Sequence, residues 1–261
     1  MKKLFFYVTV LGFISCNTSV KETVKMPGAY FMASQTVNDG TKDTKYTDLK
    51  QLKIYTDNFM MYTQVNPSDS ISAFGVGSYI SDTGTVTENV IYSASDSAFD
   101  NAHPSFKLNI TKTPDGYEQV IPQIVTDSQK YKLTEVYQSV GTAAKTPLDG
   151  VWKQTNHYTI NGKDTVKNTL TEFKAFYAGY FMFGLTDTDS ASKKNTAIGF
   201  GTFEWINNTK IKETDLNSTY SIIAGHSFDI DIQMNGADNY SQTITNGDGS
   251  KSVEFYERLI K

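Results

Sequence analysis

An internal repeat dominates this sequence of 261 residues. The segment GAYFMASQTVNDGTKDT, which begins at Gly28, aligns with GVWKQTNHYTINGKDT, which begins at Gly150. Four further pairs of segments follow in the same order: KIYTDNFMMY with AFYAGYFMF, AFGVGSY with AIGFGTF, HPSFKLNI with HSFDIDI, and TEVYQ with VEFYE. Because the landmarks keep their order, the sequence predicts two copies of one structural unit. We expect the copies over residues 28–140 and 150–261, joined by a turn-forming linker over 141–149.

Apolar and polar residues alternate within each copy. The segment FDIDIQM over residues 228–234 is a clear example, and FKLNI over 106–110 repeats it. A period of two indicates a strand with one buried face. Turn signals such as Asn38-Asp39-Gly40 separate about eight such segments per copy. A β-sandwich fits the same periodicity, but eight consecutive antiparallel strands can also close into a barrel without exposed edges.

A closed barrel places its first and last strands side by side. In the second copy, Gly150 and Trp152 lie at the start and Arg258 at the end. This arrangement resembles the Gly-x-Trp and distant Arg of the lipocalin superfamily, in which the Arg packs over the Trp where the barrel closes. The first copy has Tyr30 in place of the Trp and Ser139 where the Arg would fall. The predicted fold class is therefore all-β, with two tandem antiparallel up-and-down β-barrels of about eight strands each.

The N-terminus has the features of an export signal. Lys2 and Lys3 precede an apolar run over residues 4–14, which is too short to span a bilayer. The sequence FISC, which ends at Cys16, resembles a bacterial lipobox, so we expect lipidation of Cys16, although an ordinary signal peptide with an incidental Cys is the alternative. A single cysteine can form no internal disulfide. The expected segments are a signal peptide over 1–15 and a flexible tether over 16–27.

Over residues 28–261 the chain resembles the lipocalin-like lipoproteins of Gram-negative bacteria. The resemblance implies a fold and a place in the cell envelope, at the outer membrane facing the periplasm or the cell surface. It implies no settled ligand or reaction. The formal net charge of −4 provides no basic stripe for phosphate backbones, so we expect no nucleic-acid partner.

A glycine pair recurs in both copies, Gly75 with Gly77 and Gly199 with Gly201. Neither pair has the additional Gly or the Lys-Ser/Thr of a phosphate-binding loop. The pairs fit a bend of the barrel or a close backbone approach. Alternatively, they leave room in a cavity walled by the ligand-binding candidates Tyr79 and Phe203 on the same faces.

Glu88 and Tyr92 are further ligand-binding candidates, because they share a face with Val86 and Val90, which we expect to point inward. Glu213 repeats the pattern in the second copy. A carboxylate inside a barrel must be hydrogen-bonded, paired or protonated. Three roles stay open: a structural carboxylate, recognition of a ligand's polar end, and acid–base catalysis.

The three histidines give little support for a metal or cofactor, and we predict neither. His103 and His226 occupy matching positions before a strand, where they suit turn capping, and His157 lies on the first strand of the second copy. Zinc or haem needs several ligands that converge in one copy. No Ser-His-acid grouping recurs in both copies, so we predict no catalytic residues.

Three hypotheses follow for function. The first is a lipid-anchored envelope protein whose barrels bind a small, largely apolar ligand. The second is a non-catalytic accessory protein with filled barrels that docks an envelope protein. An enzyme that uses an interior Glu is the third. Interior volume distinguishes the first two, because ligand cavities begin at about 300 Å³.

Overall fold

The structure is a computed structural model that describes residues 23–67, 71–95, 98–100, 103–125, 129–188 and 194–261. Cys16 and the predicted signal peptide lie outside the described residues. The described residues form strands and turns, and within them no helix is long and apolar enough to cross a membrane.

The first barrel is formed by eight consecutive antiparallel strands and two short additional ones. Its strands are β1 (Gly28–Asn38), β2 (Asp43–Tyr46), β3 (Lys50–Tyr55), β4 (Phe59–Asn66), β5 (Ile71–Asp82), β6 (Thr85–Ser95), β7 (Ala98–Asp100), β8 (Ser105–Thr113), β9 (Gly116–Val125) and β10 (Lys130–Val140). The order around the barrel is β1-β3-β4-β5-β6-β8-β9-β10, and β10 pairs back with β1. Strand β2 extends the pairing of β1 beyond the end of β3, and β7 pairs with β6.

The second barrel repeats this topology with one additional strand. Its strands are β11 (Gly150–Asn161), β12 (Asp164–Asn168), β13 (Thr171–Tyr177), β14 (Tyr180–Thr188), β15 (Lys194–Asn207), β16 (Lys210–Ser218), β17 (Ser227–Met234), β18 (Asn239–Thr245) and β19 (Lys251–Arg258). Strand β19 pairs back with β11, and β12 pairs with the end of β11. The predicted fold class, two tandem antiparallel eight-stranded barrels, is confirmed.

A β-bulge recurs at the same place in both barrels. In the first, Val76 pairs with Tyr92 and Gly77 with Val90, which leaves Ile91 as an extra residue in β6. In the second, the shift falls between Phe200 and Gly201. A Cβ atom on Gly77 would collide with the backbone of β6, so the close approach of the bulged strand requires glycine.

The bulge corrects one prediction from the sequence. Tyr92 does not share the inward face of Glu88, because one inserted residue moves every later side chain to the opposite face. Its ring lies outside the first barrel, 5.3 Å from the ring of Phe173 in the second, and its hydroxyl is 2.5 Å from Thr186 Oγ1.

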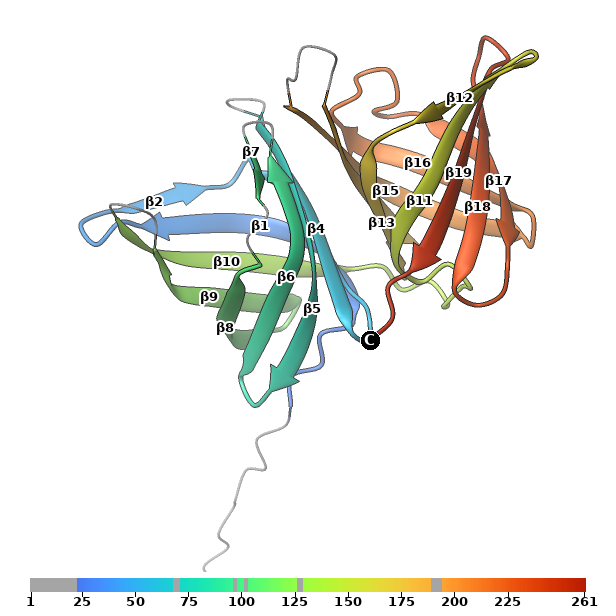
Figure 1. Ribbon diagram of the computed structural model, residues 1–261. Coiled ribbons are helices and arrows are strands. Elements are labelled where there is room, and N and C mark those ends of the chain that lie inside the picture. Colours follow the sequence, from blue (N-terminus) through green and yellow to red (C-terminus); the bar gives the residue numbers. More distant parts are fainter. Residues whose placement is uncertain (1–22, 68–70, 96–97, 101–102, 126–128, 189–193) are drawn as a thin grey trace, which may run out of the picture.

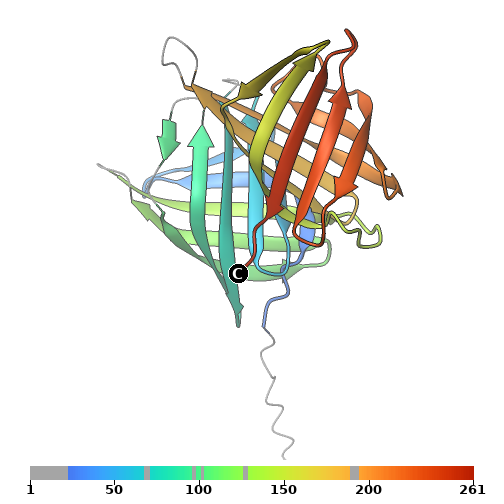
Figure 2. The ribbon, with the colours of Figure 1, turned by 45° about the vertical axis from the view of Figure 1, so that its right-hand side comes forward.

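The two barrels stand side by side and share a buried apolar interface (Figures 1 and 2). Strands β3–β6 of the first barrel contact β11 and β13–β15 of the second. The residues buried there come from both chain halves: Ala29, Leu52, Ile54, Phe59, Met61, Phe74, Val76, Ala94, Val151, Phe173, Ala175, Met182, Ile198 and Phe200. A Cβ atom on Gly184 would run into the ring of Phe74, so glycine lets the barrels approach closely. Strands at this interface are therefore buried on both faces.

Candidate functional site

A lysine and a glutamate form a buried ion pair inside each barrel. Lys53 Nζ lies 2.7 Å from Glu88 Oε1, and Lys174 Nζ lies 3.0 Å from Glu213 Oε1. The lysines occupy matching positions on β3 and β13, and the glutamates on β6 and β16. All four residues are buried. Since an unpaired buried charge is strongly unfavourable, each charge of the pair offsets the cost of burying the other.

In the first barrel the ion pair continues into a line of hydrogen bonds. Lys53 Nζ donates to Gln119 Oε1 at 3.3 Å, and Gln119 donates in turn to Glu135. The hydroxyl of Tyr137 donates to the same carboxylate at 3.0 Å. We call this sequence of side chains, Glu88 to Tyr137, the polar chain of the barrel.

The second barrel has the same polar chain. Lys174 Nζ donates to Gln242 Oε1 at 3.3 Å, and Gln242 Nε2 donates to Glu254 Oε2 at 2.7 Å. The hydroxyl of Tyr256 lies 2.7 Å from Glu254 Oε2. Five residues therefore recur in the same connectivity, Glu–Lys–Gln–Glu–Tyr.

Neutral amides complete the polar chain of the first barrel. Gln51 Nε2 donates to the Tyr137 hydroxyl at 2.6 Å, and Gln35 Nε2 donates to Glu135 Oε1 at 2.8 Å. The hydroxyl of Tyr55 donates to Glu88. Each of the two carboxylates therefore receives several donors, which is what buried charges require.

Two of the neutral positions are acidic in the second barrel. Glu172 occupies the position of Gln51, since both lie two residues before the buried lysine and face inward. Asp215 occupies the position of Val90, since each pairs with the second glycine of the matching pair. The second barrel thus buries two more carboxyl groups than the first, and both are less than a tenth exposed.

Glu172 and Glu254 compete for one hydrogen-bond donor, the hydroxyl of Tyr256. The Tyr256 hydroxyl lies 2.9 Å from Glu172 Oε1 and 2.7 Å from Glu254 Oε2, and its single hydrogen can serve only one carboxylate. Burial, followed by repulsion from Glu254, raises the pKa of Glu172 to about 8. At neutral pH this side chain is therefore largely protonated and can donate a hydrogen bond.

Asp215 is the least satisfied of the buried carboxyl groups. It is 3% exposed, and its Oδ1 accepts no hydrogen bond from any residue that the structure describes. Burial, followed by repulsion from Glu213, raises its pKa to about 7. Among the residues of this barrel with a described side chain, Lys174 is the only buried lysine, and it is already bonded to Glu213 and Gln242.

The interiors of the two barrels differ in free volume. The cavity of the second barrel measures about 650 Å³, and its polar lining includes His157, Glu172, Asp215 and Glu254. Its apolar lining consists of Leu170, Phe183, Leu185, Ile222, Ile223, Phe228, Ile230 and Ile244. The cavity of the first barrel measures about 290 Å³. Tyr30, Tyr117 and Tyr137 fill much of that interior with rings whose centroids are 4.9 Å apart in two successive contacts.

The structure places the predicted site residues in three settings. Glu88 and Glu213 line the cavities of their barrels. Tyr79 and Phe203 face the interiors but lie among core aromatics, 5.0 Å from Tyr55 and 5.1 Å from Phe176 between ring centroids, and line neither cavity. The fifth candidate, Tyr92, faces the other barrel.

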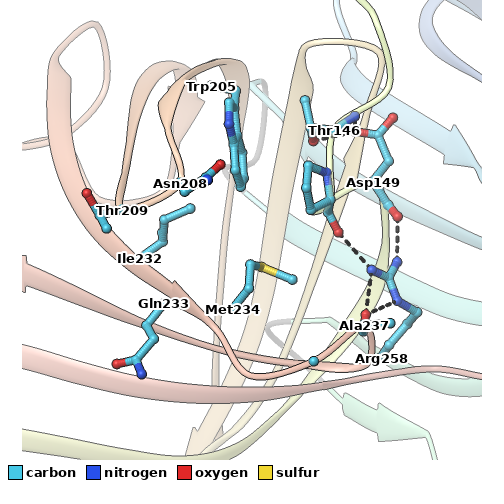
Figure 3. Close-up of a pocket in the computed structure, with 12 residues that line it drawn as sticks. Thr146, Asp149, Trp205, Asn208, Thr209, Ile232, Gln233, Met234, Ala237 and Arg258 are labelled. Atoms are coloured by element: carbon cyan, nitrogen blue, oxygen red, sulfur yellow. Dashed lines mark hydrogen bonds between the residues drawn. The ribbon is translucent and has the colours of Figure 1, made fainter.

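The residues predicted at the closure of the second barrel lie together. The Arg258 guanidinium lies 4.0 Å from the centre of the Trp152 ring, and the two residues are paired across β11 and β19. The same guanidinium donates to the carbonyl oxygens of Pro147, Asp149 and Ala237. Figure 3 shows the bonds to Asp149 and Ala237. A Cβ atom on Gly150 would collide with Arg258.

A surface depression of about 720 Å³ lies beside this closure (Figure 3). Exposed residues such as Asn208 and Gln233 form much of its wall. Four of the five N–H donors of Arg258 are directed to backbone carbonyls. The cavity of the second barrel has buried polar groups such as Glu213 and Asp215 in its lining, and it is therefore the better candidate for a binding site.

The histidines lie in different places. His103 and His226 are exposed before β8 and β17. His157 lines the cavity of the second barrel, with Nε2 2.7 Å from Ser252 Oγ and 4.0 Å from Glu254 Oε1. Within the described ranges, no three His, Cys, Asp or Glu side chains form a group that could hold a metal ion.

Sequence reasoning missed the lysines and the glutamines of the polar chains. The signal was present in the repeat, because Lys53 and Lys174 align when KIY is matched with KAF. Glu135 and Glu254 fall inside another matched pair, TEVYQ and VEFYE. Polar residues that recur at inward positions of both copies would have identified most of each polar chain.

Comparisons with known proteins assign no family. No protein-family model and no curated protein match the sequence. One similar solved structure is that of a double mutant of the vaccine antigen transferrin-binding protein B from Haemophilus parasuis Hp5. The alignment covers 90% of this chain and 60% of that chain, with 10% identity and a TM-score of 0.27. No conclusion about function is drawn from a similarity of this size.

Proposed function

We propose that this protein is a binding protein of the bacterial cell envelope, lipid-anchored through Cys16, whose second barrel holds a small, largely apolar ligand. The observation that carries this proposal is the cavity of about 650 Å³ in the second barrel. Sites for small molecules are concave, mostly apolar and fitted with a few polar groups. The cavity of the second barrel has this composition, with aliphatic and aromatic walls around a polar chain.

The first barrel has a supporting role in this proposal. Its cavity of about 290 Å³ is small for a ligand, and tyrosine rings and glutamines occupy its interior. Its outer surface covers strands β13–β15, which also form one wall of the second barrel. We therefore assign ligand binding to the second barrel and mechanical support to the first.

The proposal is tested with the neutral apolar dye N-phenyl-1-naphthylamine. The chain is produced with a plain secretion signal and with Cys16→Ser, so that no lipid competes for the dye. We expect saturable fluorescence enhancement with one dye per chain. Native mass spectrometry of the same protein, purified gently from the envelope fraction, should show a small mass that is released on denaturation.

Two matched variants test which of the two barrels binds the dye. Ile244 and Ile121 occupy equivalent positions and line the second and the first cavity. Ile244→Trp should weaken dye binding at least tenfold by filling the cavity, whereas Ile121→Trp should leave it unchanged. Absence of dye binding to the parent protein contradicts the proposal. Loss of dye binding in Ile121→Trp alone would show that the ligand binds in the first barrel and not in the second.

A further inference from the structure

The cavity of the second barrel carries an excess of acidic groups. Five carboxyl groups line it, those of Glu172, Glu213, Asp215, Asp248 and Glu254. The basic groups among its lining residues are Lys174 and His157. The lysine is committed to Glu213 at 3.0 Å, and the imidazole to Ser252 at 2.7 Å. An occupant of this cavity therefore meets a negative environment.

One acceptor in this environment is free. Asp215 Oδ1 is buried without a hydrogen-bond donor, and no described Lys or Arg forms an ion pair with Asp215. A buried acceptor without a partner is strongly unfavourable, and no described residue of the protein offsets the burial of Asp215 Oδ1. The first barrel avoids this penalty, because Val90 occupies the same position.

The walls around this acceptor restrict the rest of the ligand. Leu185, Phe228 and Ile230 line the same cavity and provide apolar surface. A group that satisfies Asp215 must bring a hydrogen-bond donor, and one that also offsets the surplus of carboxyl groups must bring a positive charge. A protonated amine on an apolar chain or ring meets all three conditions.

We propose that the ligand of the second barrel is an apolar amine whose ammonium group binds Asp215. This inference rests on the proposed function and specifies the chemical class of the ligand. A neutral donor would satisfy the hydrogen bond but leave the surplus charge.

The test is competition against N-phenyl-1-naphthylamine by three probes with the same eight-carbon chain. We expect octylamine to displace the dye at a concentration at least tenfold lower than 1-octanol, and octanoate to be the weakest competitor. If the dye binds but octylamine and 1-octanol compete equally, the inference is wrong while the proposed function stands. If the parent protein binds no dye, both are wrong.

Asp215→Asn tests the assigned residue. It should remove the preference for octylamine over 1-octanol and leave the affinity for 1-octanol within about twofold. Asp229→Asn is the matched control, since this carboxylate lies on the neighbouring strand β17 with 65% of its side chain exposed. A preference for octylamine that persists in Asp215→Asn overturns the assignment. If that variant unfolds, Asp215→Val introduces the residue of the first barrel and is tested in the same way.

The pH dependence gives a second readout. Asp215 faces a cavity whose other titratable groups are His157, Glu172, Lys174, Glu213, Tyr220, Asp248 and Glu254. As pH rises from 6 to 8, Asp215 ionises and Glu172 begins to do so, and both changes favour a cation. The affinity for octylamine should increase about tenfold over this range, with that for 1-octanol unchanged. A flat profile for octylamine contradicts the inference.

Discussion

The two barrels share a topology and a polar chain but differ in what surrounds that chain. The first surrounds its Lys–Glu pair with amides and tyrosine hydroxyls, and its interior retains about 290 Å³. The second has Glu172 and Asp215 at positions that are neutral in the first, and its cavity is about 650 Å³. The Lys–Glu ion pair is present in both barrels, which indicates that its role is structural. The residues that differ around it accompany the difference in cavity volume between the two barrels.

This contrast also separates stability from function within one molecule. A buried carboxyl group that must hold a proton or remain unsatisfied does not help a barrel to fold. Two such groups, Glu172 and Asp215, occur in the barrel with the larger cavity. The residues at the matching positions of the other barrel, Gln51 and Val90, are neutral. Unfavourable groups of this kind are concentrated at functional sites.

The largest expected effect on stability comes from replacing the buried lysine that each barrel has at the matching position. Lys53→Met and Lys174→Met each leave a buried glutamate without its cation, which costs about 3–5 kcal/mol. The loss should be greater for Lys174→Met, because more carboxyl groups surround that lysine. Urea unfolding of the full chain measures both free energies of unfolding. Losses below about 1 kcal/mol would show that the ion pairs are not structural.

A smaller effect, which depends on pH, is expected at the position that differs. The pKa of Glu172 is about 8 in the folded state and about 4.5 ordinarily, so the folded state retains a proton that the unfolded state loses in this window. The resulting stability is present below about pH 4.5 and is lost as pH rises to 8. Glu172→Gln should flatten this decline and stabilise the protein at pH 8 by on the order of 3 kcal/mol.

The reciprocal change sharpens this test. Gln51→Glu places a carboxyl group at the equivalent position of the first barrel and should create the same decline there. Thermal unfolding from pH 5 to 8 compares the three proteins. An unchanged slope in Glu172→Gln would mean that this carboxyl group titrates normally.

The smallest effect concerns the closures. Arg258→Ala removes the contact with Trp152 and the hydrogen bonds to backbone carbonyls, and should destabilise the protein by about 2 kcal/mol. Ser139→Ala at the matching position of the first barrel should change stability by less than about 0.5 kcal/mol. Equal effects in the two variants would show that the closures do not differ energetically.

The barrels could be predicted from the sequence because their determinants are local and repeated. The alternation of FDIDIQM predicts strand β17, and the order of the landmarks predicts two copies. Glu88 could be assigned to the interior because Val86 and Val90 flank it two residues away on either side. These inferences need no knowledge of how distant strands meet.

The remainder of the site depends on features that alternation does not reveal. Lys53 and Lys174 lie in strands that are buried on both faces, since one face lines the barrel and the other contacts the neighbouring barrel. Tyr92 was placed on the wrong face because a bulge inserts one residue into β6. The free volume depends on the size of many side chains together, which a single sequence does not provide.

The apolar interface between the barrels has a consequence for biogenesis. The chain emerges N-terminus first, and domains generally fold as units in that order. The first barrel therefore completes its hydrogen bonding while Leu52, Met61 and Phe74 still face solvent. Until the second barrel covers these residues, the folding intermediate exposes an apolar surface that can associate with other chains. Folding of the protein thus includes an interval in which completion of the second barrel competes with aggregation through this surface.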